Sequence, residues 1–463
     1  MNSETTSGHG RLLAVLFFGV LMAAMDIAIL GPAKPAIQST FGIDERAGSW
    51  ILNAFVLFNL VGVPIMSKLA DLFGRGRVFL SVIVTFAVGS LIVATSSSFG
   101  MLLVGRSVQG LSVSGIFPVA AAVVGDVYRP EYRGRALGIL GAVFGVAFII
   151  GPILAGILLP FGWRWIYFGY LPLIALIWIF ALKYMPRSTP ERTKAIDVRG
   201  ILFLSGALLA FTYGVNQIDP GNLWESLLAP RAWISFLVTS ILLPAFVKQE
   251  KIAEDPMLRL SMFQNRQIVL ASMIAIGAGI VEAAFISFPT LASLAMGVSW
   301  ETAAFMLVPL SVAIAVGSPL AGRLLDRSGS RAVVVASSLA MVVGMAGIAT
   351  WPGSRPAFYF CTVSIGLGLA GIMGSALNYI LMHETEVEER TASQGLITLF
   401  ISIGQLFGAA LVGSVVASTA GAVAGYSAAF FGVAAMMAGL TLLAFRLKGR
   451  VAEKETVMRS LKE

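Results

Sequence analysis

The sequence predicts an all-α membrane protein with fourteen spanning helices, arranged as two six-helix bundles and two additional helices. Three observations predict this fold: an apolar composition, apolar runs that recur along the whole chain, and an internal repeat. Of the 463 residues, 57% are hydrophobic and only 12% are charged, whereas soluble domains carry about 25% charged residues. A soluble fold could not hide so much apolar surface from water, so we expect lipid to cover it.

Runs long enough to cross a bilayer, which takes about 20 residues, follow one another from end to end. The first begins near Arg11 and lacks a small-residue cleavage signal, so we interpret it as a retained helix rather than a signal peptide. The expected spans are 11–33, 47–70, 77–97, 99–125, 134–159, 163–183, 199–217, 230–248, 267–296, 300–322, 331–351, 356–382, 392–418 and 424–446.

The basic residues predict the orientation. With the N-terminus inside, all but six of the 32 lysines and arginines fall on the inner side, which is the distribution that sets membrane topology. We therefore expect an inner-membrane protein with both termini in the cytoplasm and an even number of spans. Because these loops account for the net charge of +8, no nucleic acid is expected as a partner.

An internal repeat relates the two halves. Asp71 and Gly74 follow the second expected span, and Asp326 and Gly329 follow the tenth, both at an offset of 255 positions. Six spans per half with two inserted between them, the seventh and eighth, explain this offset. The expected divisions are 1–186 for the first bundle, 187–262 for the additional helices, 263–447 for the second bundle and 448–463 for a cytoplasmic tail.

The segments 67–77 and 322–331 carry the same pattern of Asp, Gly and Arg. They resemble the loop motif of the major facilitator superfamily, Gly-x-Leu-x-Asp-Arg-x-Gly-Arg-Lys/Arg, which follows the second helix of each half. The first copy departs from it at Ser67, Leu72 and Gly76. The resemblance implies two bundles and a conformational latch at the cytoplasmic interface, and the glycine permits a tight turn. The latch residues are Asp71, Gly74, Arg75, Arg77, Asp326, Arg327, Gly329 and Arg331.

The fourth expected span contains Arg106, Gln109, Gly110 and Gly115, and resembles the family element Arg-x-x-Gln-Gly-x-x-x-Gly. The resemblance implies a role for Arg106 in proton coupling. An arginine at membrane depth is costly and is usually functional or firmly paired. The alternative is a packing residue that extends to the outer interface.

The fifth expected span contains Gly151, Pro152 and Gly156 after a series of spaced glycines. It resembles the antiporter element Gly-Pro-x-x-Gly-Gly, with Ala147 and Ala155 in place of two glycines. A Gly-Pro pair favours a helix kink and small residues allow close helix crossing. The resemblance implies export by antiport, and glycine packing alone is the alternative.

The sixth expected span opens with Trp163, Arg164 and Trp165, and the seventh is preceded by Asp197. These features resemble the signature of the fourteen-span drug:proton antiporter branch. Interfacial anchoring is the alternative account of the tryptophans and the arginine.

Two carboxylates lie inside apolar runs: Asp26 in the first span and Glu282 in the ninth. They are 256 positions apart, close to the repeat offset, so we expect both to face a central cavity. A membrane-embedded carboxylate costs several kcal/mol unless it is paired, hydrated or protonated, and Asp26 also matches the first-helix aspartate of the antiporter branch. Asn53 and Asn378 are further cavity candidates. Structural hydrogen bonding is the alternative for each.

The predicted function is a proton-coupled secondary transporter that exports lipophilic or cationic drug-like compounds by alternating access, as a multidrug efflux protein would in antibiotic resistance. The alternative is a major facilitator transporter of one physiological substrate, such as a lipid, siderophore or amino acid derivative. Lys34 near the outer mouth weakens the case for cations. The sequence contains no Gly-x-x-x-x-Gly-Lys-Ser/Thr or His-Glu-x-x-His motif, so neither an ATP-driven pump nor an enzyme is expected. One cysteine and two histidines predict no metal site. We expect a monomer without a cofactor, whose partners are protons, a small-molecule substrate and the bilayer.

Overall fold

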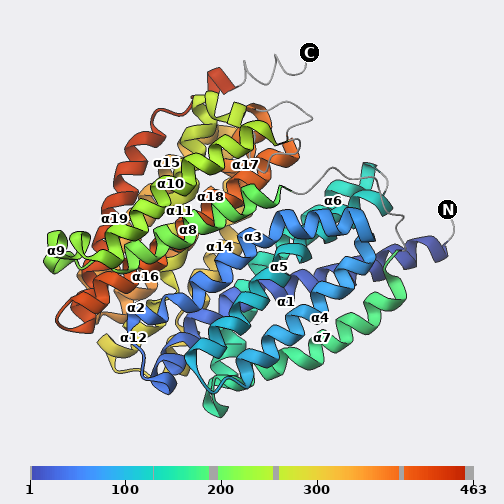
Figure 1. Ribbon diagram of the computed structural model, residues 1–463. Coiled ribbons are helices and arrows are strands. Elements are labelled where there is room, and N and C mark those ends of the chain that lie inside the picture. The colour runs from blue at the N-terminus through green and yellow to red at the C-terminus, as the bar shows by residue number, and fades with distance from the viewer. Residues whose placement is uncertain (1–2, 129, 187–196, 254–259, 385–389, 454–463) are drawn as a thin grey trace.

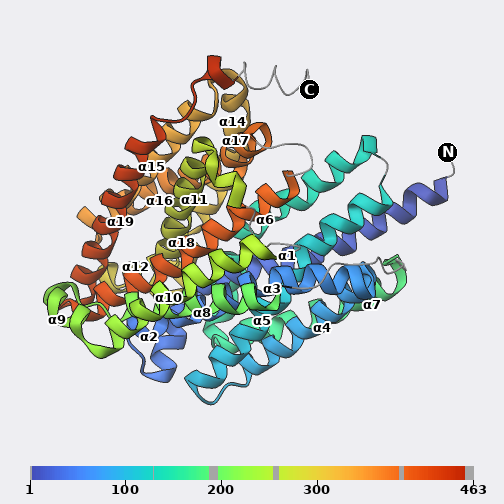
Figure 2. The same ribbon diagram turned by 45° about the horizontal axis from the view of Figure 1, so that its top comes forward.

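The computed structural model describes residues 3–128, 130–186, 197–253, 260–384 and 390–453, and these residues are helical with short connections. Twelve of the described helices are long and apolar enough to cross a membrane. The protein is therefore an all-helical, multi-pass membrane protein. Both termini lie toward the same end of the molecule, and the short helices α2 and α12 lie at the opposite end (Figures 1 and 2). We call this opposite end the α2 end.

The N-terminal part contains six long helices, with the short α2 (Glu45–Gly48) between the first two and a 3-10 turn at Leu159–Phe161. The long helices are α1 (Ser3–Phe41), α3 (Trp50–Phe73), α4 (Arg75–Ala94), α5 (Phe99–Val127), α6 (Pro130–Leu158) and α7 (Arg164–Tyr184).

The middle of the chain forms a pair of helices, α8 (Val198–Asn216) and α10 (Pro230–Ile252), joined by the 3-10 turn Pro220–Asn222 and α9 (Leu223–Leu228). A further 3-10 turn at Leu260–Gln264 leads into the C-terminal part. Helix α8 packs against α10, α3 and α18, while α10 is mostly exposed. The two additional helices therefore border the seam between α3 and α18.

The C-terminal part contains α11 (Arg266–Phe285), α12 (Phe288–Met296), α13 (Trp300–Phe305), α14 (Val308–Ser328), α15 (Ser330–Thr350), α16 (Arg355–Gly371), a π-helical turn (Ile372–Ala376), α17 (Leu377–Glu384), α18 (Arg390–Ser418) and α19 (Ala422–Ala444). Two expected single spans are divided here, the ninth into α11 and α12 and the tenth into α13 and α14. Pro289 and Pro309 follow the breaks, and a proline lacks the N–H that would continue the preceding helix.

The count of fourteen spans exceeds the twelve that length and composition support. The two expected spans without a counterpart among the twelve are 134–159 and 356–382. In the first, the apolar helix recognised within the described residues is the shorter Gly145–Phe161. In the second, the π-helical turn ends α16 after 17 residues.

Helix packing follows the same order in the two parts of the chain. In the N-terminal part, α1 packs on α6, α5 on α3 and α4, and α7 on α4; in the C-terminal part, α11 packs on α18, α16 on α14 and α15, and α19 on α15. Glycines permit the closest approaches: a Cβ at Gly110 would meet the backbone carbonyl of Phe55, and one at Gly366 would meet that of Leu310. The repeated packing agrees with the sequence repeat.

Candidate functional site

The most deeply buried charges form an ion pair between α1 and α5. Arg106 is fully buried and Asp26 is 1% exposed. The Arg106 Nη1 atom donates to Asp26 Oδ2 at 2.5 Å and to Gln109 Oε1 at 2.9 Å, and its Nε donates to the carbonyl of Ile51 at 3.2 Å. The sequence predicted each of the first two residues as a site residue, and the structure brings them together across 80 positions.

Gln109 completes the arrangement around this pair. Its Nε2 donates to Ser90 Oγ at 3.0 Å and to Asp26 Oδ1 at 3.3 Å. The Arg106 guanidinium also lies over the Phe55 ring, with 4.5 Å to the ring centroid. Side chains or carbonyls from α1, α3, α4 and α5 therefore fix one carboxylate and one guanidinium, while Arg106 Nη2 has no hydrogen-bond partner among the described residues.

Small residues allow the polar groups to meet. A Cβ at Gly110 would collide with the backbone of α3 at Phe55, and one at Gly89 would lie 2.8 Å from the Gln109 side chain. Because both positions lack a Cβ, α5 lies close enough to α3 for Arg106 to reach the Ile51 carbonyl. The site thus depends on backbone approach as much as on the charged residues.

Glu282, the second predicted carboxylate, lies on α11 in the C-terminal part and is 6% exposed. A side-chain hydrogen bond joins it to Gln405 on α18, and its Oε2 has no partner among the described residues. The described side chains bring no cation against it. The repeat suggested equivalent sites, but Asp26 pairs with a cation whereas Glu282 contacts an amide, and their shared central cavity stays a prediction.

The other predicted residues lie apart from this pair. Asn53 on α3 is fully buried, and neither amide atom has a partner among the described residues. Gly151 and Pro152 lie inside α6, where a Cβ on Gly151 would lie 2.6 Å from Ala28 on α1. A Cβ on Gly156 would lie 2.6 Å from the Phe305 ring.

The two loop motifs adopt the expected turns. Gly74 and Gly329 have φ values of 89° and 81°, a conformation that favours glycine, and each separates two long helices. Arg75 donates to the carbonyl of Ala122 at 3.1 Å, while Arg77, Arg327 and Arg331 are exposed. The side chains of Asp71, Asp326 and Asn378 lie outside the described residues, so the latch and the Asn378 site stay predictions.

A second buried ion pair was not predicted as a site. Lys34 on α1 pairs with Glu45 on α2, and Ser287 and Tyr426 from the C-terminal part hydrogen-bond to the same pair. The signal available in the sequence was a lysine inside an apolar run followed, 11 positions later, by an acid.

The chain matches the sequence profile of the Major Facilitator Superfamily over residues 16–409 and 270–460. It is 31% identical over 412 residues to an uncharacterized MFS-type transporter, YfiU, of Bacillus subtilis, covering 87% of this chain and 79% of the relative. It is 28% identical to multidrug resistance protein 3 of the same organism, over 86% of this chain and 78% of the relative. It is also 26% identical to the multidrug resistance protein Stp of Mycobacterium tuberculosis, over 86% and 74%.

Solved structures agree on the fold. The nucleoside transporter NupG superposes with a TM-score of 0.66 at 13% identity, covering 94% of this chain and 99% of the other. The xylose transporter XylE of E. coli superposes with a TM-score of 0.64 at 12% identity, covering 96% and 99%.

Proposed function

Because this chain belongs to the Major Facilitator Superfamily and is a multi-pass membrane transporter, we propose that it is a proton-coupled exporter. In this proposal it exchanges protons for lipophilic or cationic drug-like compounds by alternating access. The observation that carries the proposal is the fully buried Asp26–Arg106 pair, a charged site inside a membrane bundle. Relatives named multidrug resistance proteins, at 26–28% identity, support the substrate class.

The Asp26–Arg106 pair offers a proton-dependent contact. With Asp26 ionised, its carboxylate balances the Arg106 guanidinium at 2.5 Å. A proton on Asp26 removes the negative charge, and Arg106 keeps only its neutral acceptors, the Gln109 amide oxygen and the Ile51 carbonyl. Protonation therefore changes the electrostatic balance between α1 and α5, and this change is the step that we propose couples protons to movement of the helices.

Glu282 supplies the second exchange site of the proposal. Its carboxylate has one amide contact and an unpartnered oxygen among the described residues. A bound proton and a cationic substrate can compete for such a group, so that each promotes release of the other. Asn53, with its buried and unpartnered amide, is proposed as a polar contact for substrate.

We further propose fourteen spans with both termini in the cytoplasm, in the inner membrane. Helix α6 has 29 residues, and the helical chain from Arg355 to Glu384 continues through its π-helical turn. Adding these two to the twelve gives the two six-helix bundles, 1–186 and 263–447, with the additional helices in 187–262. The repeated helix packing supports this division.

The proposed function is tested by transport in proteoliposomes under an imposed proton gradient, with cationic dyes and a set of neutral and acidic metabolites. We expect dye movement that Asp26→Asn and Glu282→Gln abolish or uncouple from the gradient. Glu225→Gln is the matched control, because it removes an exposed carboxylate on α9. If both buried-carboxylate variants transport like the wild type, the coupling mechanism is wrong. If one metabolite moves and no dye does, the substrate class is wrong and the specific transporter takes its place.

A further inference from the structure

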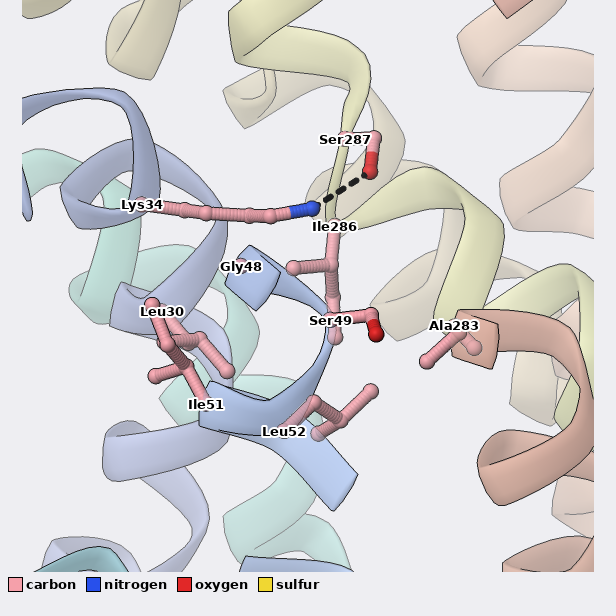
Figure 3. Close-up of a pocket in the computed structure, with 10 residues that line it drawn as sticks. Leu30, Lys34, Gly48, Ser49, Ile51, Leu52, Ala283, Ile286 and Ser287 are labelled. Carbon is pink, nitrogen blue, oxygen red and sulfur yellow. Dashed lines mark hydrogen bonds between the residues drawn. The ribbon is translucent and has the colours of Figure 1, made fainter. Parts of the chain in front are cut away.

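The Lys34–Glu45 pair lies at the α2 end, where the N-terminal and C-terminal parts meet. Both side chains are buried, with residue exposures of 5% and 7%. The Lys34 Nζ atom donates to Glu45 Oε1 and, at 3.1 Å, to Ser287 Oγ at the break between α11 and α12 (Figure 3). A charge pair belonging to one part of the protein is therefore covered by the other part.

The Glu45 carboxylate accepts hydrogen bonds from both sides of this boundary. From its own side, Gln38 Nε2 donates to Oε2 at 2.7 Å. From the C-terminal part, the Tyr426 hydroxyl donates to Oε2 at 2.8 Å and Ser287 Oγ donates to Oε1 at 3.2 Å. A hydroxyl has one donor and two acceptor sites, so Ser287 can accept from Lys34 and donate to Glu45 together. We call Lys34, Gln38, Glu45, Ser287 and Tyr426 the Glu45 cluster.

The backbone at this boundary is packed closely enough to exclude water. A Cβ on Gly31 would lie 3.1 Å from the carbonyl of Ile286, and one on Gly413 would lie 3.0 Å from the carbonyl of Glu45. Arg46 adds a contact across the same boundary, donating to Ser418 Oγ at 3.0 Å. The Glu45 cluster is thus the charged centre of a closed surface between α1 and α2 on one side and α11, α18 and α19 on the other.

The division of charge makes this closure reversible. Both ions belong to the N-terminal part, so separating the two parts leaves Lys34 and Glu45 paired. Removing one member of a buried pair is strongly destabilising because it leaves an uncompensated charge, and opening here avoids that loss. The groups lost on opening are the neutral donors Ser287 and Tyr426, and water can replace a lost hydrogen bond to a charged group.

We propose that the Glu45 cluster is the gate of the α2 end, with Ser287 and Tyr426 holding it closed through the Glu45 carboxylate. The gate rests on the alternating access of the proposed function, since a transporter must at some stage open this end. In this role Ser287 and Tyr426 are positioning residues, and they set the ratio of closed to open protein without contacting the proton sites.

The test is a distance measurement between spin labels on the two sides of the gate. Labels are attached to cysteines at the exposed positions Ser39 and Ala420, in a background in which the native Cys361 is replaced by Ser. We expect a dominant short distance in the wild type. Ser287→Ala with Tyr426→Phe should raise the ratio of long to short distances by about tenfold or more, as expected for two lost hydrogen bonds to a charged group. Each single variant should give an intermediate ratio.

Gln38→Met is the matched control, because it removes a donor to the same Glu45 oxygen without crossing the boundary. An unchanged distance distribution in the double variant, or an equal shift in Gln38→Met, overturns the gate. Melting of the double variant below that of the Gln38→Met protein does not replace this readout, since the ratio is measured on folded protein. A shifted ratio without proton-driven transport in the wild type keeps the gate and removes the coupling. An unshifted ratio with intact coupled transport does the reverse.

Discussion

Breaking the Asp26–Arg106 pair from its two sides should give two different pH dependences of stability. Asp26→Asn leaves the buried Arg106 guanidinium without its counter-ion. Its remaining acceptors are the Gln109 amide at 2.9 Å and the Ile51 carbonyl at 3.2 Å, and arginine stays charged at any working pH. Removal of one partner from a buried pair costs about 3–5 kcal/mol. We therefore expect that loss in unfolding free energy across the whole pH range.

Arg106→Gln leaves a buried carboxylate, which can lose its charge by binding a proton. Its remaining described contact is Gln109 Nε2 at 3.3 Å. An exposed aspartate in the unfolded chain releases its proton near pH 3.9, so above about pH 5 the unfolded state holds no proton there. If the folded variant holds one, stability falls as pH rises, by about 1.4 kcal/mol per pH unit. Between about pH 5 and 8 the loss grows by up to about 4 kcal/mol.

The assay is unfolding of purified protein in mixed micelles, followed by intrinsic fluorescence at several pH values. Arg231→Gln, the same change at an exposed position, is the control and should match the wild type. The double variant, Asp26→Asn with Arg106→Gln, should recover part of each loss, because it leaves no unpaired charge. Equal losses for Arg106→Gln at low and high pH would refute the reasoning, as would a loss below about 1 kcal/mol for Asp26→Asn.

Two further predictions concern the fold. Gly110→Ala presses a methyl group on the backbone of α3 and should cost about 1–3 kcal/mol of unfolding free energy, while Gly432→Ala, with open space around it, should be neutral or stabilising in the same assay. In fourteen-span topology, single cysteines at Ser354 and Arg390 lie on opposite sides of the membrane and should react with impermeant reagents from opposite sides. Reaction from one side would remove the span formed by α16 and α17.

Most of the helical architecture could be predicted from the sequence because lipid imposes a simple rule: long apolar runs form helices. The turn glycines were equally accessible, since Gly74 and Gly329 stand at the same place in both repeats and both adopt positive φ. The breaks before Pro289 and Pro309 were not predicted, although proline marked them. The π-helical turn at Ile372–Ala376 has no comparable sequence signal, because it arises from local packing.

The candidate site was predicted as residues rather than as a constellation. Asp26, Arg106 and Gln109 stood out as polar groups in apolar runs, but spacing suggested that Asp26 belongs with Glu282. Its ion pair with Arg106 depends on how closely α5 approaches its neighbours, which composition does not encode. Glu45 was missed for a different reason: an acid beside a turn usually points to solvent, and only the C-terminal part covers it.

The placement of the ion pairs bears on how the protein can move. Among the described residues, the pairs Lys34–Glu45 and Asp26–Arg106 each lie within the N-terminal part, and Lys448–Glu384 lies within the C-terminal part. The described polar contacts across the α2 end are instead made by hydroxyl groups. Pulling apart two opposite charges would cost much more than exchanging a hydroxyl for water. Relative movement of the two parts therefore leaves each described ion pair intact, while protonation of a single carboxylate alters a pair from within, and this separation lets a proton influence the movement without being the contact that the movement breaks.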